Sequence, residues 1–114
     1  MSEADEMFWE LVDELRFADS RVEEGTIMGS RCARVCGEFL ALTGFKDSGL
    51  VVKLPRDRVD ELVAAGTGRP FAPAGRVFRE WVSVPEPDVD LWRLLLAEGV
   101  VFVAPSRPSS ADGV

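Results

Sequence analysis

The chain has 114 residues, 46% of them hydrophobic, and a net charge of −7, which suits one globular domain. No apolar run approaches the roughly 20 residues that span a bilayer, and the acidic start MSEADE is unlike a secretory signal. We therefore expect a soluble, cytoplasmic protein with no membrane partner. The absence of histidine excludes Ser-His and Cys-His nucleophilic sites and histidine-ligated zinc within one chain. We accordingly expect no catalytic residue, no metal and no cofactor.

Residues 2–18 are predicted to form the first helix. Phe8, Leu11, Val12 and Leu15 follow the i, i+3, i+4, i+7 spacing of one buried stripe, and acidic residues occupy the opposite side. Such a run of carboxylates is more often a solvated helix face than an acid–base pair.

Residues 25–54 are predicted to form a three-stranded antiparallel meander. Phe39 and Ala41 share one strand parity with the apolar residues earlier in the run, and Gly37 between the two stretches indicates a hairpin turn or a bulge. A second glycine-containing turn leads into the short strand 50–54, which has two β-branched residues at its centre.

The second half of the chain alternates helix and strand. Pro55 suits a first helical turn and Gly66 suits a helix stop, so a helix is predicted over residues 55–65. The elements that follow are a loop (66–75), a strand (76–84), a helix capped by Asp88 and ended by Gly99, a further helical turn or short strand (100–104), and a disordered Pro/Ser-rich tail (105–114).

The expected fold is α+β, in the order helix, three strands, helix, strand, helix. Because consecutive strands with short connections usually pair, we expect a mostly antiparallel sheet of about four or five strands with the helices packed on one face. Residues 1–104 are expected to form a single domain.

Five segments together resemble the TfoX N-terminal domain family. They are a glycine-containing entry to the first strand (26–30, TIMGS), a G-x-F-h-A-h run with h hydrophobic (37–42), a strand that holds a lysine (50–54), a Gly-x-Pro-Phe loop (68–71) and a closing W-x-x-V-P strand (81–85). Ile27-Met28 stands where the family usually has Met-Phe. The motif positions with an expected structural role are Gly29, Gly37, Phe39, Trp81 and Pro85.

This resemblance implies a non-enzymatic interaction or regulatory module related to the competence regulators TfoX/Sxy. The layout is also distantly similar to the MmcQ/YjbR group, which implies nothing beyond fold. The expected partner is a protein or a second copy of the chain.

The middle of the chain holds the candidate contact residues. Residues 25–84 carry nine basic and six acidic side chains, whereas the first 24 residues carry nine acidic and two basic ones. The candidates for contact with an anion or a partner are Arg31, Arg34, Lys53, Arg76 and Arg79. Arginine suits bidentate contact with phosphate or carboxylate, although within each arginine pair the two side chains have opposite strand parity. Ion pairs with the acidic first helix are the structural alternative.

The two cysteines, Cys32 and Cys36, are four positions apart, a spacing of roughly 13 Å in an extended strand. That spacing is too long for a disulfide, so we expect two reduced thiols. Two functions other than protein contact stay open from the sequence: a nucleic-acid-binding regulator that uses the arginine-rich middle segment, and a small-ligand-binding protein or enzyme of unknown type.

Overall fold

The computed structural model describes residues 3–27, 29–44, 49–72 and 75–104. In chain order the elements are α1 (Glu3–Ala18), β1 (Val22–Ile27), β2 (Ser30–Val35), β3 (Glu38–Thr43), β4 (Leu50–Lys53), α2 (Arg56–Ala64), β5 (Arg69–Phe71), β6 (Phe78–Val84) and α3 (Val89–Val103). The tail expected to be disordered, residues 105–114, lies outside the described residues. Within the described ranges no helix is long and apolar enough to cross a membrane.

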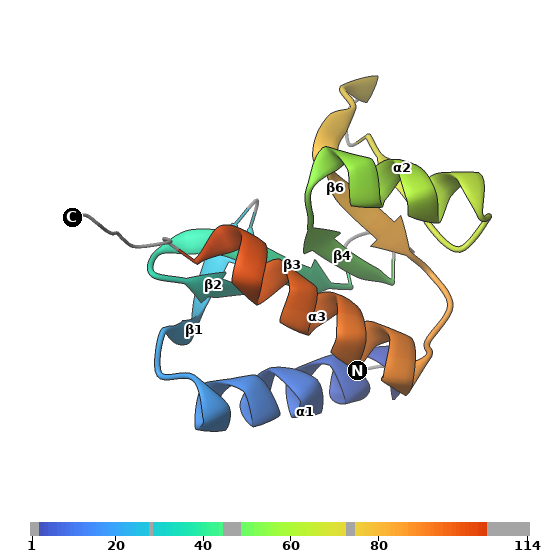
Figure 1. Cartoon of the computed structure of the whole chain (residues 1–114). Helices are drawn as coiled ribbons and strands as arrows, with labels where there is room; N and C mark the ends of the chain where they lie inside the picture. The colour runs from blue at the N-terminus through green and yellow to red at the C-terminus, as the bar shows by residue number, and fades with distance from the viewer. Residues whose placement is uncertain (1–2, 28, 45–48, 73–74, 105–114) are drawn as a thin grey trace.

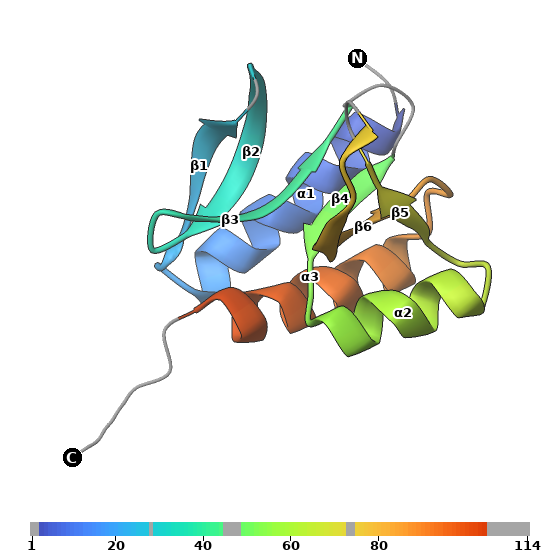
Figure 2. The same cartoon turned by 90° about the horizontal axis from the view of Figure 1, so that it is seen from above.

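One antiparallel sheet organises the fold. Its strand order in the described part of the chain is β1-β2-β3-β4-β6-β5, and each neighbouring pair is antiparallel. Figure 2 shows the three helices on one side of this sheet, and Figure 1 shows α3 lying between α1 and α2. The α+β class, the helix order and the one-sided helix packing are therefore confirmed. The sheet has six strands instead of the four or five expected.

The two unexpected strands lie at the two edges of the sheet. β1 carries exposed Glu23 and Glu24, so its sequence lacks the alternating apolar pattern of a half-buried strand. β5 is three residues long and contains Pro70, which an edge strand tolerates because one side of its backbone needs no sheet partner. Residues 66–75, expected to be a loop, thus include a short strand, and the expected strand at 76–84 begins at Phe78.

The turn predicted at Gly37 joins β2 to β3. Val35 pairs with Glu38 across a two-residue turn, and the φ angles of Cys36 and Gly37 are 51° and 84°. Positive φ at both central residues is the requirement of a type I′ hairpin turn, whose twist matches that of the strands. Glycine meets this requirement without strain, and the Gly37 N–H also donates to Glu23 Oε2 at 2.9 Å.

A bulge in β3 then changes which side chains face the helices. Ala33 pairs with Ala41 while Arg34 pairs with Phe39, which leaves Leu40 as the extra residue. Leu40 and Ala41 therefore both lie in the core under the helices, whereas Phe39 lies on the opposite face. The shared parity of Phe39 and Ala41 expected from the sequence is wrong because simple alternation has no extra residue.

The main core fills the space between the helices and the sheet. The predicted stripe of α1 is confirmed, with Phe8, Leu11 and Val12 buried and Leu15 packed at the edge. α3 contributes Trp92, Leu95 and Leu96, and full burial of a leucine side chain stabilises the fold by roughly 1.5–3 kcal/mol. The cap of α3 is also confirmed, since Asp88 Oδ1 accepts from Leu91 N at 3.1 Å.

α3 does not end at Gly99 but continues to Val103, so the segment that follows Gly99 is helical. The glycine is there because the helix packs closely on the sheet. A Cβ at this position would lie 2.8 Å from Leu40 Cδ1 and 3.1 Å from the carbonyl oxygen of Lys53. The absent side chain thus permits close helix–sheet packing and does not mark a helix stop.

A second, smaller apolar cluster lies on the sheet face away from the helices. Its buried members are Cys32, Phe39, Leu42, Val51 and Phe71. The half-buried Trp81 stacks on Phe39 with ring centroids 4.1 Å apart and on Phe71 at 5.5 Å. The aromatic contacts fix the Trp81 ring beside the first residues of β6, where the candidate site described next begins.

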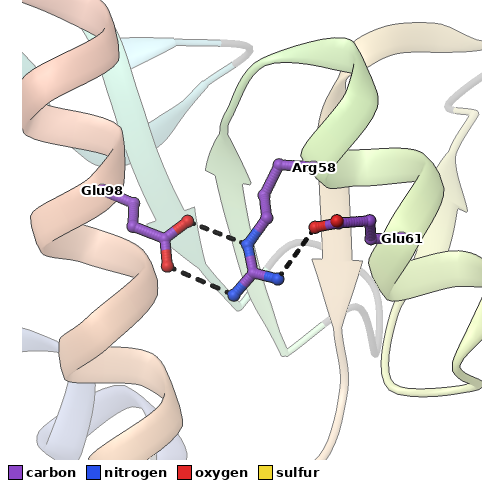
Figure 3. Close-up of polar contacts among 3 residues, drawn as sticks. All are labelled: Arg58, Glu61 and Glu98. Carbon is purple, nitrogen blue, oxygen red and sulfur yellow. Dashed lines mark hydrogen bonds and ion pairs between the residues drawn. The ribbon is translucent and has the colours of Figure 1, made fainter.

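Ionic contacts fix α2 against α3. Arg58 of α2 donates from Nε to Glu98 Oε1 at 2.9 Å and from Nη2 to Glu98 Oε2 at 3.2 Å, and it also reaches Glu61 (Figure 3). This bidentate contact fixes the relative orientation of the two side chains in addition to attracting their charges. α2 is therefore fixed in place, which matters because its other side forms a wall of the candidate site.

Candidate interaction site

The five cations predicted to make external contacts do not share one surface. Arg31 pairs with Glu24 at 2.6 Å and lies over the Trp9 ring of α1 at 4.2 Å. The hydrogen bond from Arg31 lowers the pKa of Glu24 below its ordinary value. The structural alternative, an ion pair with the acidic first helix, is wrong for Arg31: its carboxylate partner comes from β1, and its contact with α1 is with the Trp9 ring.

Arg34 lies on the opposite face of β2 and is also bonded within the fold. Its guanidinium donates to the carbonyl oxygens of Thr26 at 2.6 Å and Gly37 at 2.8 Å. The side chain lies across Gly25, where a Cβ would come within 2.6 Å of Arg34 Cδ. These bonds hold the turn between β2 and β3 against β1, so Arg34 has a structural role.

The other three candidates lie on the far half of the sheet. Lys53 is half-buried in β4 opposite Trp81, and Arg76 is exposed in the segment before β6. Arg79 is exposed within β6 and borders a cleft. Of the five predicted contact residues, Arg79 lines this cleft, whereas Arg31 lines a separate hollow beside the start of α1.

This cleft lies between α2 and the paired strands β5 and β6 and has a volume of about 240 Å³. Seven of its lining residues are apolar and three are charged. They are Val59, Val63, Ala64, Pro70, Val77, Phe78 and Trp81, with Arg56, Asp60 and Arg79. We call it the α2–β6 cleft.

The sequence builds this cleft from two distant segments. On α2, Arg56, Val59 and Val63 recur at the i, i+3, i+7 spacing of one helix face, which places them along the same wall. On the sheet side, Phe78 meets Trp81 edge-to-face with centroids 4.9 Å apart. Val77 just before β6 leaves 53% of its surface exposed. The cleft therefore presents an apolar surface that is partly open to solvent.

The described lining of the cleft has more basic than acidic side chains, although the chain as a whole is acidic. Arg58 is bonded to carboxylates, whereas Arg56 and Arg79 have no ion pair among the described residues. Asp60 is the one carboxylate among the described residues of the lining. Two available guanidinium groups beside an apolar wall suit an anionic ligand that also carries an apolar group.

Two other hollows fit a ligand less well. One lies beside the start of α1 and includes Arg31 and Thr43, whose buried Oγ1 has no hydrogen-bond partner in the described part of the chain; its guanidinium is already paired with Glu24. The other lies at the end of α3, where the charged groups, Arg58 and Glu98, are bonded to each other. Neither offers an available cation next to an extended apolar wall.

Both cysteines are free thiols, as expected from their spacing. Cys32 is buried in the second apolar cluster, and burial raises the pKa of its thiol, an effect that the nearby Arg34 guanidinium opposes. Cys36 is exposed in the turn between β2 and β3. Among the residues with described positions, no group of three or more metal-ligating side chains occurs.

The motif positions of the sequence have structural roles. Gly29 turns the chain between β1 and β2 with φ 76°, and Gly37 does so in the next hairpin. Phe39 and Trp81 stack in the second apolar cluster. Pro85 ends β6 so close to Gly49 that a Cβ on this glycine would lie 2.6 Å from Pro85 Cα.

Of the ten lining residues, the sequence singled out Arg79 as a contact residue and Trp81 as a structural position. The other eight, among them Arg56, Asp60, Val77 and Phe78, were not predicted to belong to a site. The repeat of Arg56 with the apolar residues of α2 was a signal that could have identified one wall. The opposite wall depends on how β6 pairs with β4 and β5, which the local sequence does not encode.

Comparisons of the chain with models of protein families, with curated proteins and with solved structures found no match.

Proposed function

We propose that this chain is a non-enzymatic interaction module that binds a segment of a partner protein in the α2–β6 cleft. The chemistry of this segment complements the cleft. Its acidic side chains contact the two guanidinium groups, and an apolar side chain packs against the apolar wall. The observation that carries the proposal is the position of Arg56 and Arg79, without ion pairs in the described residues, beside an apolar wall in a chain of net charge −7.

A protein partner fits this surface better than nucleic acid does. Phosphate contacts require cations that line up along a common face, whereas Arg31 and Arg34 are bonded within the fold on opposite faces of β2. Asp60 in the cleft and the net charge of −7 both repel a polyanion. A peptide offers a few acids and an apolar anchor at a spacing that a small cleft can accommodate.

The resemblance to TfoX N-terminal domains belongs to the same proposal. It implies a regulatory module without a catalytic centre, and its motif positions occupy turns and the second apolar cluster. In this proposal those positions maintain the fold while the α2–β6 cleft makes the contact.

The test is a fluorescence-anisotropy titration with labelled acidic peptides that contain one aromatic residue, alongside scrambled peptides of equal charge that lack it. The protein is the wild type, the Arg56→Glu/Arg79→Glu variant, and a matched control, Arg69→Glu/Arg76→Glu. The control makes the same change in net charge at arginines outside the cleft lining. Arg69 and Arg76 directly precede the lining residues Pro70 and Val77, so the control separates charge next to the cleft from charge within its lining.

We expect the aromatic acidic peptides to bind the wild type and the control and to lose at least about tenfold in affinity, roughly 1.4 kcal/mol, on the cleft variant. Equal losses in the two variants would show nonspecific charge attraction and overturn the assignment to the cleft. Labelled duplex and single-stranded DNA are titrated in parallel. DNA binding that falls steeply with salt and disappears in the cleft variant would replace the protein partner with nucleic acid.

A further inference from the structure

Phe17, in the last turn of helix α1, has an exposed side chain that the packing of the fold does not explain. Phe17 leaves 96% of its surface exposed, more than any other large hydrophobic residue in the described part of the chain. Large aromatic side chains contribute strongly to interfaces when a partner covers them. The other aromatic residue near this helix surface, Trp9, is covered by Arg31, so Phe17 stands out as an uncovered anchor.

The residues that precede Phe17 on the same helix face are acidic. Glu6, Glu10, Asp13 and Phe17 are spaced by four, three and four positions, which aligns them along one side of α1, and all four are exposed. At about 1.5 Å per residue this stripe is roughly 17 Å long. Asp13 lies 3.7 Å from Arg16, while Glu6 and Glu10 have no ion pair within the described ranges. We call these four residues the acidic stripe.

The acidic stripe has the chemistry that the α2–β6 cleft complements. It offers carboxylates on the same helix face as one aromatic anchor, and the cleft offers two guanidinium groups without ion pairs in the described residues beside an apolar wall. α1 cannot reach the cleft of its own chain, because α3 lies between α1 and α2 in both views (Figures 1 and 2). The complementary surface must therefore come from another molecule.

We propose that the partner segment of the α2–β6 cleft is helix α1 of a second copy of this chain, with Phe17 inserted as the anchor and the acids of the stripe facing Arg56 and Arg79. This inference rests on the function proposed above and specifies its ligand. The contact joins two different surfaces, so it is heterologous, and an assembly that does not close into a ring keeps one free stripe and one free cleft for further copies.

Charge complementarity selects the α2–β6 cleft over the hollow at the end of α3. That hollow is apolar and carries the exposed Val101, but its Arg58 and Glu98 are bonded to each other. An acidic helix therefore finds no available cation there. Val101, with 81% of its surface exposed, provides a matched control for loss of an exposed apolar side chain.

The experiment measures mass against concentration by sedimentation velocity from about 10 µM to about 1 mM, a range that covers micromolar to millimolar dissociation constants. Four proteins are compared: wild type, Phe17→Ser, Arg56→Glu/Arg79→Glu, and Val101→Ser. All substituted positions are exposed, and circular dichroism verifies that each variant is folded. We expect the mass of wild type and Val101→Ser to rise with concentration and the other two to stay monomeric.

Mixing the two variants that are expected to be monomeric tests directly whether the stripe of one copy binds the cleft of another. Phe17→Ser retains an intact cleft and Arg56→Glu/Arg79→Glu retains an intact stripe, so their mixture should form a one-to-one pair that neither forms alone. Three results would overturn the inference. The wild type could stay monomeric up to about 1 mM, both variants could still self-associate, or the mixture of the two variants could stay monomeric. If the wild-type cleft still binds acidic aromatic peptides in that case, the proposed function holds and only the identity of the ligand is wrong.

Discussion

Replacing Gly99 with alanine is expected to destabilise the protein, although helix propensity alone predicts the reverse. Alanine is about 1 kcal/mol more favourable than glycine in a helix interior. At Gly99 the new methyl group would lie 2.8 Å from Leu40 Cδ1, 3.1 Å from Lys53 O and 3.2 Å from Val52 Cγ2. Two of these contacts come from fully buried side chains and one from the backbone, so the surroundings have little room to move.

The packing term is expected to exceed the propensity term. Inserting an extra methyl group into a well-packed core costs about 1–3 kcal/mol. With a central value of about 2 kcal/mol and a propensity gain of about 1 kcal/mol, the net loss is about 1 kcal/mol. For a chain of this size such a loss lowers Tm by about 4 °C.

Urea and thermal unfolding followed by circular dichroism measure this change. Ala97→Gly is the matched control, because Ala97 lies two residues away on the exposed side of the same helix. That substitution should destabilise by about 1 kcal/mol through propensity alone. If Gly99→Ala instead raised Tm while Ala97→Gly lowered it, the close packing of α3 on β3 and β4 would not be the reason for the glycine.

Three further outcomes are expected. A double-mutant cycle with Arg58→Met and Glu98→Gln should give a coupling free energy of about 1 kcal/mol, because the pair is two-pronged but one-third exposed; coupling near zero contradicts an anchoring role. Hydrogen bonds from Arg21 lower the pKa of the Asp19 carboxyl group from 3.8 to about 2. The ionised carboxylate therefore stabilises the fold above pH 3.8, and this contribution is lost as the pH falls through about 2. Asp19→Asn should flatten the pH dependence of unfolding between those values, and an unchanged profile contradicts the ion pair. A thiol reagent should modify Cys36 in the folded protein and Cys32 only after unfolding; equal rates contradict the burial.

Local signals in the sequence were sufficient where one element determined its own structure. The apolar stripe of α1 and the Asp88 cap were predicted correctly, and the turn at Gly37 is one of the two alternatives predicted there, because periodicity and backbone requirements are encoded within a few residues. The edge strand β1 was missed because Glu23 and Glu24 conceal its strand pattern, and only its pairing with β2 stabilises it.

Where packing across elements determined the structure, local patterns were misleading. Gly99 was interpreted as a helix stop because a close-packed glycine and a terminal one look alike in sequence. The bulge at Leu40 reversed the strand parity on which face assignments depended. The candidate site has the same origin, since α2 and β6 are separated in the chain and folding alone brings the cations Arg56 and Arg79 to the lining of one cleft.

The uneven charge of the molecule makes the proposed self-contact depend on ionic strength in two opposing ways. At 0.01 M salt the Debye length is about 30 Å, comparable to the 27 Å shortest dimension of the molecule, so the net charge of −7 on each copy repels the other. At about 0.15 M it is about 8 Å, which screens this repulsion while the contacts of Arg56 and Arg79 with carboxylates persist at short range. At 1 M it is about 3 Å, and those contacts are weakened too. Self-association of the wild type, measured by sedimentation, should therefore pass through a maximum at intermediate salt. The Phe17→Ser variant should show no association at any of these salt concentrations. A steady increase with salt would instead indicate apolar contact alone, without the guanidinium–carboxylate pairing.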